Sequence, residues 1–468
     1  MTTVGTKGDN QSAEITQIDT KLQESSGTIS EDEFWISVEN NVHDVDDKTD
    51  KPQIQRIPLL LLEKNSNKIR YDPVVVSIGP YYHGRSDLAS LEKLKIPIAQ
   101  KFVRACGNNV SSSQLYKEVA KVGDSARKCY EKDAIPFDNE SFNKMMFLDA
   151  CFVLQIMSVY YETESPHDKK NFLRSSDLVF VCRDLLLLEN QIPFLVLKLL
   201  MKFRFKCEID GIMLIMNFLD RTAIMPPEGS TCINAIKKFV QRMMGCGVQY
   251  DGWEIVMDAP HLLHLAREQF IGSSPKDKNK EISVKWYSNQ SVTELESSGI
   301  HFRPSQTNRV TDVKFKSHLI SSTLTLPPLK VDDSTISLLF NMAAYEMCSQ
   351  GPSDYRIMSY ICLMDSFINH ADDVKWLRKR RTLINHLGSD KELAQLFNGI
   401  GNDLIFDPYA YADVKWQIEN HCKNKARVWI GEWMHDHFSS PWAFLASLGV
   451  IFVIALTMVQ TYFTVFPP

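Results

Sequence analysis

The 468-residue sequence has no excess of positive charge and none of the compositional biases that mark fibrous or wholly disordered chains. Its 52 Lys and Arg residues are outnumbered by 57 Asp and Glu residues, which gives a net charge of −5 and a pI near 6.2. Because the chain has no general cationic field, a nucleic-acid partner is disfavoured. With 44% hydrophobic and 23% charged residues, the composition is that of a globular protein with a sizeable core.

The sequence also lacks the short motifs of common enzymes and of exported proteins. It has no Gly-x-Ser-x-Gly motif, no phosphate-binding Gly-rich loop and no His-Glu-x-x-His motif. A secretory signal is missing, and Thr2 stands where an N-myristoylated protein needs glycine. The ten cysteines include no Cys-x-x-Cys pair, which fits reduced thiols in the cytosol. We therefore expect no cofactor and no metal.

The first fifty residues differ in composition from the rest of the chain. Met1 to Lys51 holds twelve acidic and four basic residues, and few large apolar side chains. Such a segment cannot bury enough apolar surface to offset the entropy of ordering its backbone. We predict that residues 1–52 form a disordered acidic tail.

The C-terminal end carries the longest apolar run. No Asp, Glu, Lys, Arg or His follows His437, and 19 of the 25 residues from Trp442 to Phe466 are apolar. A helix of that length covers about 37 Å, enough for the roughly 30 Å hydrocarbon layer. Basic residues lie on its N-terminal side, at Lys423, Lys425 and Arg427. The sequence predicts a single-pass tail anchor over 442–466 with the bulk of the chain in the cytosol, and leaves open which membrane it enters. A buried core helix is the alternative.

Between these ends the pattern is mainly helical. Apolar residues from Leu115 to Ala126 repeat every three or four positions, which predicts an amphipathic helix. Residues 145–160 and 178–201 are predicted to be buried core helices. The sequence ENQIP divides the second into two helices, with Asn190 as the cap of the new helix.

A change of composition follows the charged segment 272–281, which is typical of a linker. Short alternating pieces from 282 to 331 predict a small antiparallel sheet, after which Asp332 to Ser334 can cap another helix. The predicted fold class is mainly α (α+β). The domain is predicted to span 53–438, with a helical part at 53–271, the linker, and a β-containing and then helical part at 282–438.

Several motifs in a fixed order identify a family resemblance. They are IQRIPLLLLEKNSNKIRYDPVVVSIGPYYHGRSDLASLEKLK, MMFLDACFVLQ, DLLLLENQIPFLVL, SVTELESSGIHF, LTLPPLKVDDSTISLLFNMAAYE and SPWAFLA. Over about residues 53–468 the chain resembles the plant family catalogued as domain of unknown function 247. The resemblance implies a plant, often membrane-associated protein with no established activity. Some grass members of that family are associated with self-incompatibility recognition between pollen and stigma.

The chain departs from the family pattern at two places. Tyr82 stands where the family often has a second histidine, and Ala150 and Gln155 stand where it often has glycine and glutamate. If that glutamate were a catalytic acid, this protein would lack it.

Three side chains are candidate binding residues, and no residue is assigned a catalytic role. His83 lies in VVVSIGPYYHG, where an apolar strand is expected to run into a Gly-Pro turn that is either a functional loop or a structural turn. Asp149 lies in the apolar segment MMFLDACFVLQ. Glu189 lies in ENQIP, either as a perturbed carboxylate of a site or as a polar group of the helix joint. If the structure places these three side chains in one deep pocket within hydrogen-bonding reach of one another, the interpretation as an enzyme is favoured.

Two further patterns carry weak indications of function. His261 and His264 are three residues apart and share a predicted helix face, but no matching Cys or His pair stands nearby to complete a metal site. The run LRKRR at 377–381 fits a solvated helix face, a patch that binds anionic lipid or an import signal.

The sequence therefore supports two hypotheses for function. The first is a non-enzymatic, membrane-tethered interaction or recognition protein with an unknown protein partner. The second is an enzyme with an uncharacterised site near the GPYYHG and ENQIP motifs. A small-molecule ligand stays unknown under both.

Overall fold

The computed structural model describes most of the chain outside the N-terminal segment. The described residues are 52–62, 68–132, 135–162, 173–222, 259–272, 290–307, 309–318, 321–400, 404–424 and 441–465. The predicted acidic tail, apart from Pro52, lies outside the described residues, as do 273–281 of the predicted linker and the first residues of the predicted β section.

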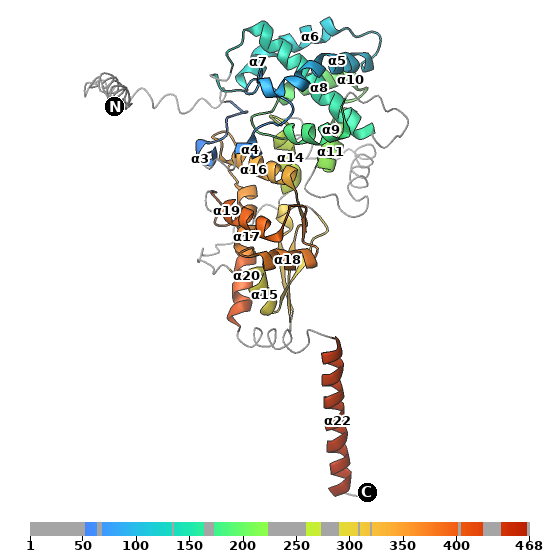
Figure 1. Ribbon diagram of the computed structural model, residues 1–468, viewed down its shortest axis with the longest axis vertical. Helices are drawn as coiled ribbons and strands as arrows, with labels where there is room; N and C mark the ends of the chain where they lie inside the picture. Colours follow the sequence, from blue (N-terminus) through green and yellow to red (C-terminus); the bar gives the residue numbers. More distant parts are fainter. Residues whose placement is uncertain are drawn as a thin grey trace, which may run out of the picture. The chain divides into compact units, whose positions relative to one another are not determined.

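Helices make up most of the described chain, as the sequence predicts (Figure 1). The helices of the first half are α3 (Leu59–Leu62), α4 (Lys68–Tyr71), η2 (Ser86–Leu88), α5 (Ala89–Ala105), α6 (Ser112–Lys121), α7 (Gly123–Lys128), α8 (Asn139–Glu162), α9 (Ser175–Asp184), α10 (Phe194–Arg204), α11 (Glu208–Thr222) and α14 (Leu262–Ile271). Those of the second half are α15 (Val292–Ser297), η4 (Val310–Asp312), α16 (Asp333–Met347), α17 (Arg356–Phe367), α18 (Ala371–Lys379), α19 (Asp390–Ile400), α20 (Ala412–Lys423) and α22 (Pro441–Val465).

The central helix of the first half is α8. Its residues from Asp149 to Ser158 are all buried, because α5, α6, α10 and α11 pack around it. The predicted helix over 145–160 lies within it. On α6 and α7, the buried residues Leu115, Val119 and Ala126 form the face that the spacing predicts. These helices share one apolar core with α16 and α17.

The predicted joint inside 178–201 is present. Helix α9 ends at Asp184 and α10 begins at Phe194, so residues 185–193 connect two helices. The predicted cap is wrong, because α10 begins directly after Pro193 and Asn190 bonds elsewhere. At α16 the predicted cap is confirmed, since the Asp332 carboxylate accepts the Thr335 N–H at 2.9 Å.

The β section is mixed, and the prediction of an antiparallel sheet is therefore wrong. Strand β3 (Ser322–Leu326) lies between β1 (Ile300–Pro304), which is parallel to it, and β2 (Lys314–Ser317), which is antiparallel. Because the chain passes through η4 between β1 and β2, the two strands form no hairpin and pair with opposite edges of β3. Phe302 and Phe315 both align with Leu324, so three buried side chains cross this sheet.

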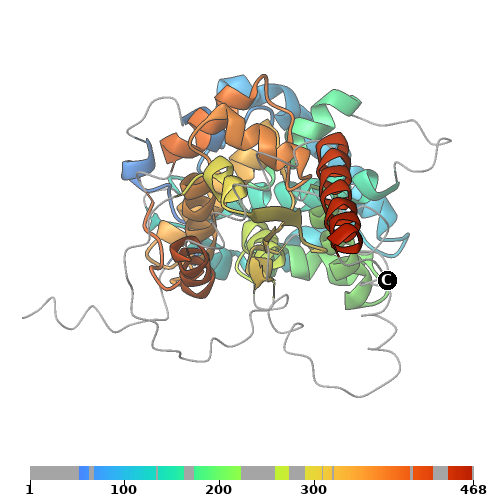
Figure 2. The same cartoon turned by 90° about the horizontal axis from the view of Figure 1, so that it is seen from below.

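A second, two-stranded sheet joins distant parts of the chain. Strand β4 (Leu329–Val331) pairs in parallel with β5 (Leu383–Asn385), which lies beyond the predicted β section. The strands lie among helices of the second half in both views (Figures 1 and 2). A three-residue strand carries no periodicity from which the sequence could predict it.

Helix α22 spans Pro441–Val465 and thereby confirms the predicted apolar helix. Two helices in the described part of the chain are long and apolar enough to cross a membrane. One is the core helix α8, whose segment 139–160 is 78% buried. The other is segment 445–462 of α22, which has a mean hydropathy of 1.9 and no buried residue.

Candidate functional site

The joint between α9 and α10 presents buried polar side chains to distant segments of the backbone. Asp184, Glu189, Asn190 and Gln191 have exposed fractions between 0% and 8%. Buried polar groups are costly unless they are hydrogen-bonded. Each of the four bonds to at least one main-chain group outside the joint, so the joint supports the chain around it.

The apolar segment 74–78 is held by these side chains and has no strand partner, so the predicted strand is wrong. The N–H groups from Val74 to Val76 all donate to the Asp184 carboxylate, at 2.8 to 3.2 Å. The Ile78 N–H donates to the Asn190 side chain at 2.7 Å. The β-branched run therefore forms an irregular segment that is fixed by residues more than a hundred positions away.

Gly79 follows this segment and begins the turn that carries the candidate histidine. Its φ is +75°, and a Cβ there would lie 2.7 Å from the Gln191 carbonyl oxygen and 2.9 Å from the Tyr130 hydroxyl. The Tyr130 hydroxyl donates to that carbonyl at 2.9 Å. Glycine is therefore required on two grounds, its backbone conformation and the close approach.

Glu189 lies under this turn and accepts two hydrogen bonds. The Ile57 N–H donates to one carboxylate oxygen at 2.8 Å, and the Tyr82 hydroxyl donates to the other at 2.8 Å. Burial and the nearby carboxylates of Glu189 and Asp72 raise the pKa of Tyr82, which keeps its hydroxyl a donor. Glu189 thus connects the entry of the domain to the GPYYHG turn.

Asp149 and Lys95 form an ion pair between α8 and α5. Asp149 Oδ1 lies 2.6 Å from Lys95 Nζ, and the Gly79 N–H donates to Asp149 Oδ2 at 2.8 Å. Lys95 also donates to the Ser77 carbonyl at 2.7 Å and to Glu92 at 2.5 Å. Burial raises the pKa of Asp149, and Lys95 and the Gly79 N–H oppose that rise.

His83 is the one exposed member of the three candidates. Its side chain is 36% exposed, with Nδ1 3.7 Å from Glu92 Oε1 and its ring edge-on to Phe137. His83 is thus linked to Asp149 through Glu92 and Lys95. The described contacts do not join His83 directly to Asp149 or Glu189.

Asp149 and Glu189 are therefore buried members of a polar network that holds the backbone around the GPYYHG turn, whereas His83 lies at the surface and approaches this network through Glu92. The acceptor oxygens of Asp149 and Glu189 are engaged by the backbone, a lysine and a tyrosine, as in a structural network. Ser77, whose hydroxyl is 3.5 Å from Lys95 Nζ, is 1% exposed and offers no access to a substrate. The arrangement fixes the turn and displays His83 at its surface.

Sequence reasoning missed two central members of this network, Lys95 and Asp184. Lys95 had a visible signal, because Leu91, Lys95, Ile98 and Phe102 are spaced by four, three and four residues on the buried face of α5. A lysine at such a position needs a buried partner. Asp184 had no comparable signal, because its partners are backbone N–H groups 108 to 110 positions earlier, which no local spacing reveals.

The two histidines of HLLHLAREQF are part of the core. His261 precedes α14 and accepts the His264 N–H, so it caps the helix and does not lie on its face. The His264 ring bonds to the Tyr345 hydroxyl at 3.0 Å. Burial lowers the pKa of His261 to about 3 and that of His264 to about 4, so both rings are neutral at pH 7.

The cationic run 377–381 is tied into local structure. Arg378 pairs with Asp390 at 2.6 Å, and Arg380 makes two bonds to the buried carboxylate of Glu296, at 2.7 and 2.9 Å. Two of the four cations of the run are thus engaged within the protein, which favours helix-end packing over a patch that binds an anionic surface.

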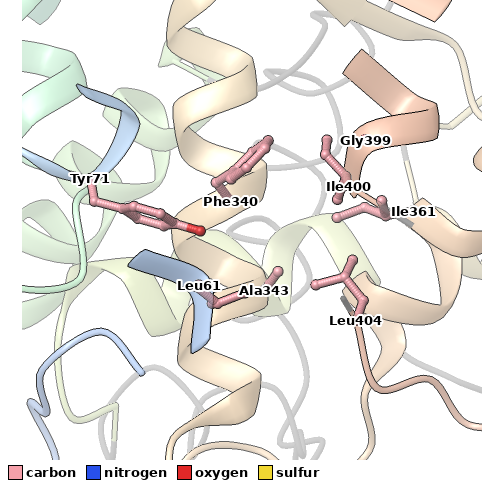
Figure 3. Close-up of a pocket in the computed structure, with 8 residues that line it drawn as sticks. All are labelled: Leu61, Tyr71, Phe340, Ala343, Ile361, Gly399, Ile400 and Leu404. Atoms are coloured by element: carbon pink, nitrogen blue, oxygen red, sulfur yellow. The ribbon is translucent and has the colours of Figure 1, made fainter. Parts of the chain in front are cut away.

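A small apolar cavity in the described part of the chain is lined by none of the three candidates. It has a volume of about 20 Å³, room for about one water molecule. Figure 3 shows the Tyr71 hydroxyl directed toward it. The lining residues are Leu61, Tyr71, Phe340, Ala343, Ile361, Gly399, Ile400 and Leu404. Within the described ranges, no group of three or more His, Cys, Asp or Glu residues is arranged to hold a metal ion.

Comparisons with known proteins identify relatives over most of the chain. A family model described as a plant protein of unknown function, DUF247, matches residues 54–456. The UPF0481 protein At3g47200 of Arabidopsis thaliana is 30% identical over 425 residues, which cover 84% of this chain and 83% of the relative. The putative UPF0481 protein At3g02645 of the same plant is 22% identical over 507 residues, covering 92% and 93%. No solved structure matches the chain.

Proposed function

Because this chain belongs to the DUF247 family of plant proteins of unknown function, we propose that it is a membrane-tethered protein whose body binds a protein partner without catalysing a reaction. The α22 helix is the tether, and the bulk of the chain faces the cytosol. The recognition role in self-incompatibility that the resemblance implies stays a prediction, since neither relative's name states an activity.

The observation that carries the proposal is the nature of α22. Its 25 residues contain no charged side chain, and large apolar side chains such as Ile451, Phe452 and Met458 are 63%, 65% and 68% exposed. An exposed apolar helix of this length is unfavourable in water and favourable in a bilayer. The hydroxyls of Thr457, Thr461 and Thr464 donate to carbonyls four residues earlier, which suits them to hydrocarbon.

The non-enzymatic part of the proposal is supported by the polar network around the GPYYHG turn. Asp149 and Glu189 are buried, and their oxygens serve as acceptors for main-chain and side-chain donors. A general acid or base must instead reach a substrate. The alternative of an enzyme near GPYYHG and ENQIP therefore has less support than an interaction protein.

Membrane extraction tests the tether. Plant membranes carrying the tagged full-length chain are washed with alkaline carbonate, alongside a chain truncated after Phe438 and an Ile454→Asp variant. We expect the full-length chain to stay with the membrane and the truncated chain to be released. The aspartate costs about 2.5–3.5 kcal/mol at the centre of a spanning helix, so this variant should be retained less well.

Ser447→Ala is the matched control, because it changes the same helix without adding charge and should behave like the parent. Equal retention of the full-length and truncated chains would contradict the tether and with it the proposed function.

A further inference from the structure

Four large side chains in α20 and in the connection just before it are exposed. Ile405, Phe406 and Tyr409 lie in the connection before α20, and Trp416 lies on α20 itself, with exposed fractions of 54%, 44%, 64% and 51%. We refer to these four residues as the aromatic surface. Large exposed apolar side chains that cluster on one protein generally mark a contact site.

The backbone beneath the aromatic surface is fixed by hydrogen bonds. The Asp407 N–H donates to the Ser359 hydroxyl at 3.0 Å, and the Tyr411 hydroxyl donates to the Val310 carbonyl at 2.9 Å. The Ala412 N–H donates to the Tyr409 carbonyl at 3.0 Å. The connection before α20 is therefore held by several hydrogen bonds, while Phe406 and Tyr409 are exposed to solvent.

Lys415 on α20 lies next to Phe406 and so connects the two parts of the aromatic surface. The Lys415 ammonium nitrogen lies 5.9 Å from the centre of the Phe406 ring, and Trp416 follows it on the helix. Trp416 lies two residues from both Val414 and Ile418, which are buried, so it occupies the outward side of α20.

The position of α20 in the chain indicates what covers this surface. It is the last helix that the structure describes before α22, and the 17 residues 424–440 between them span at most about 60 Å when fully extended. Once α22 is inserted, the bilayer surface stays within reach of the body at a high effective concentration. Tyrosine and tryptophan are the residues that prefer the boundary between headgroups and hydrocarbon.

The balanced charges of α20 favour contact with a lipid surface through aromatic side chains over attraction to anionic lipid through cations. On α20, Lys415 and Lys423 are balanced by Asp413 and Glu419, and Lys423 pairs with Glu419 at 3.0 Å. A surface that bound anionic lipid by charge would need a cluster of unpaired cations.

We propose that the aromatic surface rests on the headgroup region of the membrane that holds α22 and so orients the body against the bilayer. This inference rests on the proposed tether. The aromatic surface is thus proposed to contact lipid. Contact of the same four residues with a protein is the alternative that the experiment must distinguish.

Photocrosslinking of the full-length chain tests this inference. A photoreactive phenylalanine derivative replaces Tyr409 or Trp416, and each variant is reconstituted into phosphatidylcholine vesicles and irradiated. Ile96 on α5 is the matched control, because its exposed fraction of 57% is close to theirs, and Met458 on α22 is the positive control. We expect lipid adducts at 409, 416 and 458, each several-fold above the yield at 96.

The outcomes separate this inference from the proposed function. Suppose that lipid adducts form at position 458 but are no more frequent at 409 and 416 than at 96. This result would refute contact of the aromatic surface with the membrane and leave the tether intact. Protein adducts in place of lipid adducts at 409 and 416 would also refute that contact. No lipid adduct at 458 would remove the tether and this inference together.

Discussion

Lys95 and Asp149 form a buried ion pair, with Nζ and Oδ1 2.6 Å apart and side chains that are 3% and 1% exposed. The pair joins α5 to α8, and each partner also bonds to the backbone next to the GPYYHG turn, at Ser77 and Gly79. Two core helices and the turn therefore depend on one another. A buried pair of this kind adds little net stability, because both charges must leave water, but removing one partner is costly because the other charge is left buried and uncompensated.

The first prediction is that Lys95→Met destabilises the protein strongly, by about 3–5 kcal/mol, because it leaves the Asp149 carboxylate buried without its cation. Denaturant unfolding of the solubilised full-length chain, followed by tryptophan fluorescence, measures the change. The double variant Lys95→Met/Asp149→Asn should recover part of the loss, since no uncompensated charge remains.

The matched control is Lys121→Met. Lys121 pairs with Glu118 at 2.6 Å with the same three-residue spacing as Lys95 and Glu92, but its side chain is 67% exposed. Its removal should cost less than about 1 kcal/mol. If both variants lose the same free energy of unfolding, burial of the Lys95–Asp149 pair does not increase the cost of removing the lysine, and the prediction is wrong.

Elements defined by local spacing could be predicted from the sequence. The apolar period of α6, the apolar run of α8, the break between α9 and α10, the cap at Asp332 and the apolar helix α22 all follow from neighbours within a few residues. The hydrogen-bond partners of the polar side chains could not be predicted in this way. Asp184 bonds to a backbone segment 108 to 110 positions earlier, and no local pattern contains that information.

The segment from Val74 to Ile78 shows why the prediction failed there. A run of valine and isoleucine is typical of a strand, but a strand also needs a partner with free backbone groups. Here Asp184 and Asn190 take the partner's place. For the candidate site, sequence reasoning selected Asp149 and Glu189, which are members of the buried network, but it could not show that their oxygens are occupied.

The second prediction concerns Asn190→Ala. Loss of the side chain leaves the Ile78 N–H and the carbonyls of Val76 and Asp184 without these bonds inside the core. Because each buried unsatisfied group costs about 1–3 kcal/mol, we expect a loss of about 3 kcal/mol, more than the removal of a helix cap.

Glu189→Gln is the companion variant and should cost about 1 kcal/mol, because the amide oxygen can still accept the Ile57 N–H. Thermal unfolding measures both. If both variants melt like the parent but lose binding to a native partner, the joint belongs to a functional site and its structural role is refuted.

The third prediction concerns the side of the membrane on which the body lies. Asn109 and Asn139 are exposed and stand in Asn-x-Ser sequons, so they would be glycosylated in the secretory lumen. We expect glycosidase treatment to cause no mobility shift. A sequon appended beyond Pro468 serves as the control and should be modified if the anchor enters the endoplasmic reticulum. A shift that disappears when Asn109 and Asn139 are changed to Gln would reverse the proposed orientation.

The last prediction is a loss of stability in acid that depends on His261. Its pKa of about 3 in the folded chain lies below the ordinary value of 6.5, so the folded state favours the neutral ring. The unfolded chain therefore binds the proton first, and stability falls as the pH drops below about 6.5, by roughly 1–2 kcal/mol between pH 7 and pH 5. Above pH 7 this contribution should be constant.

His261→Asn isolates this effect, because asparagine keeps an acceptor at the start of α14 and does not titrate. Denaturant unfolding at pH 7 and at pH 5 should show a smaller difference for this variant than for the parent. His318→Asn, which changes an exposed histidine, should keep the parental difference. If His261→Asn retains the full difference between the two pH values, the buried ring does not titrate on unfolding, and the acid sensitivity comes from other groups.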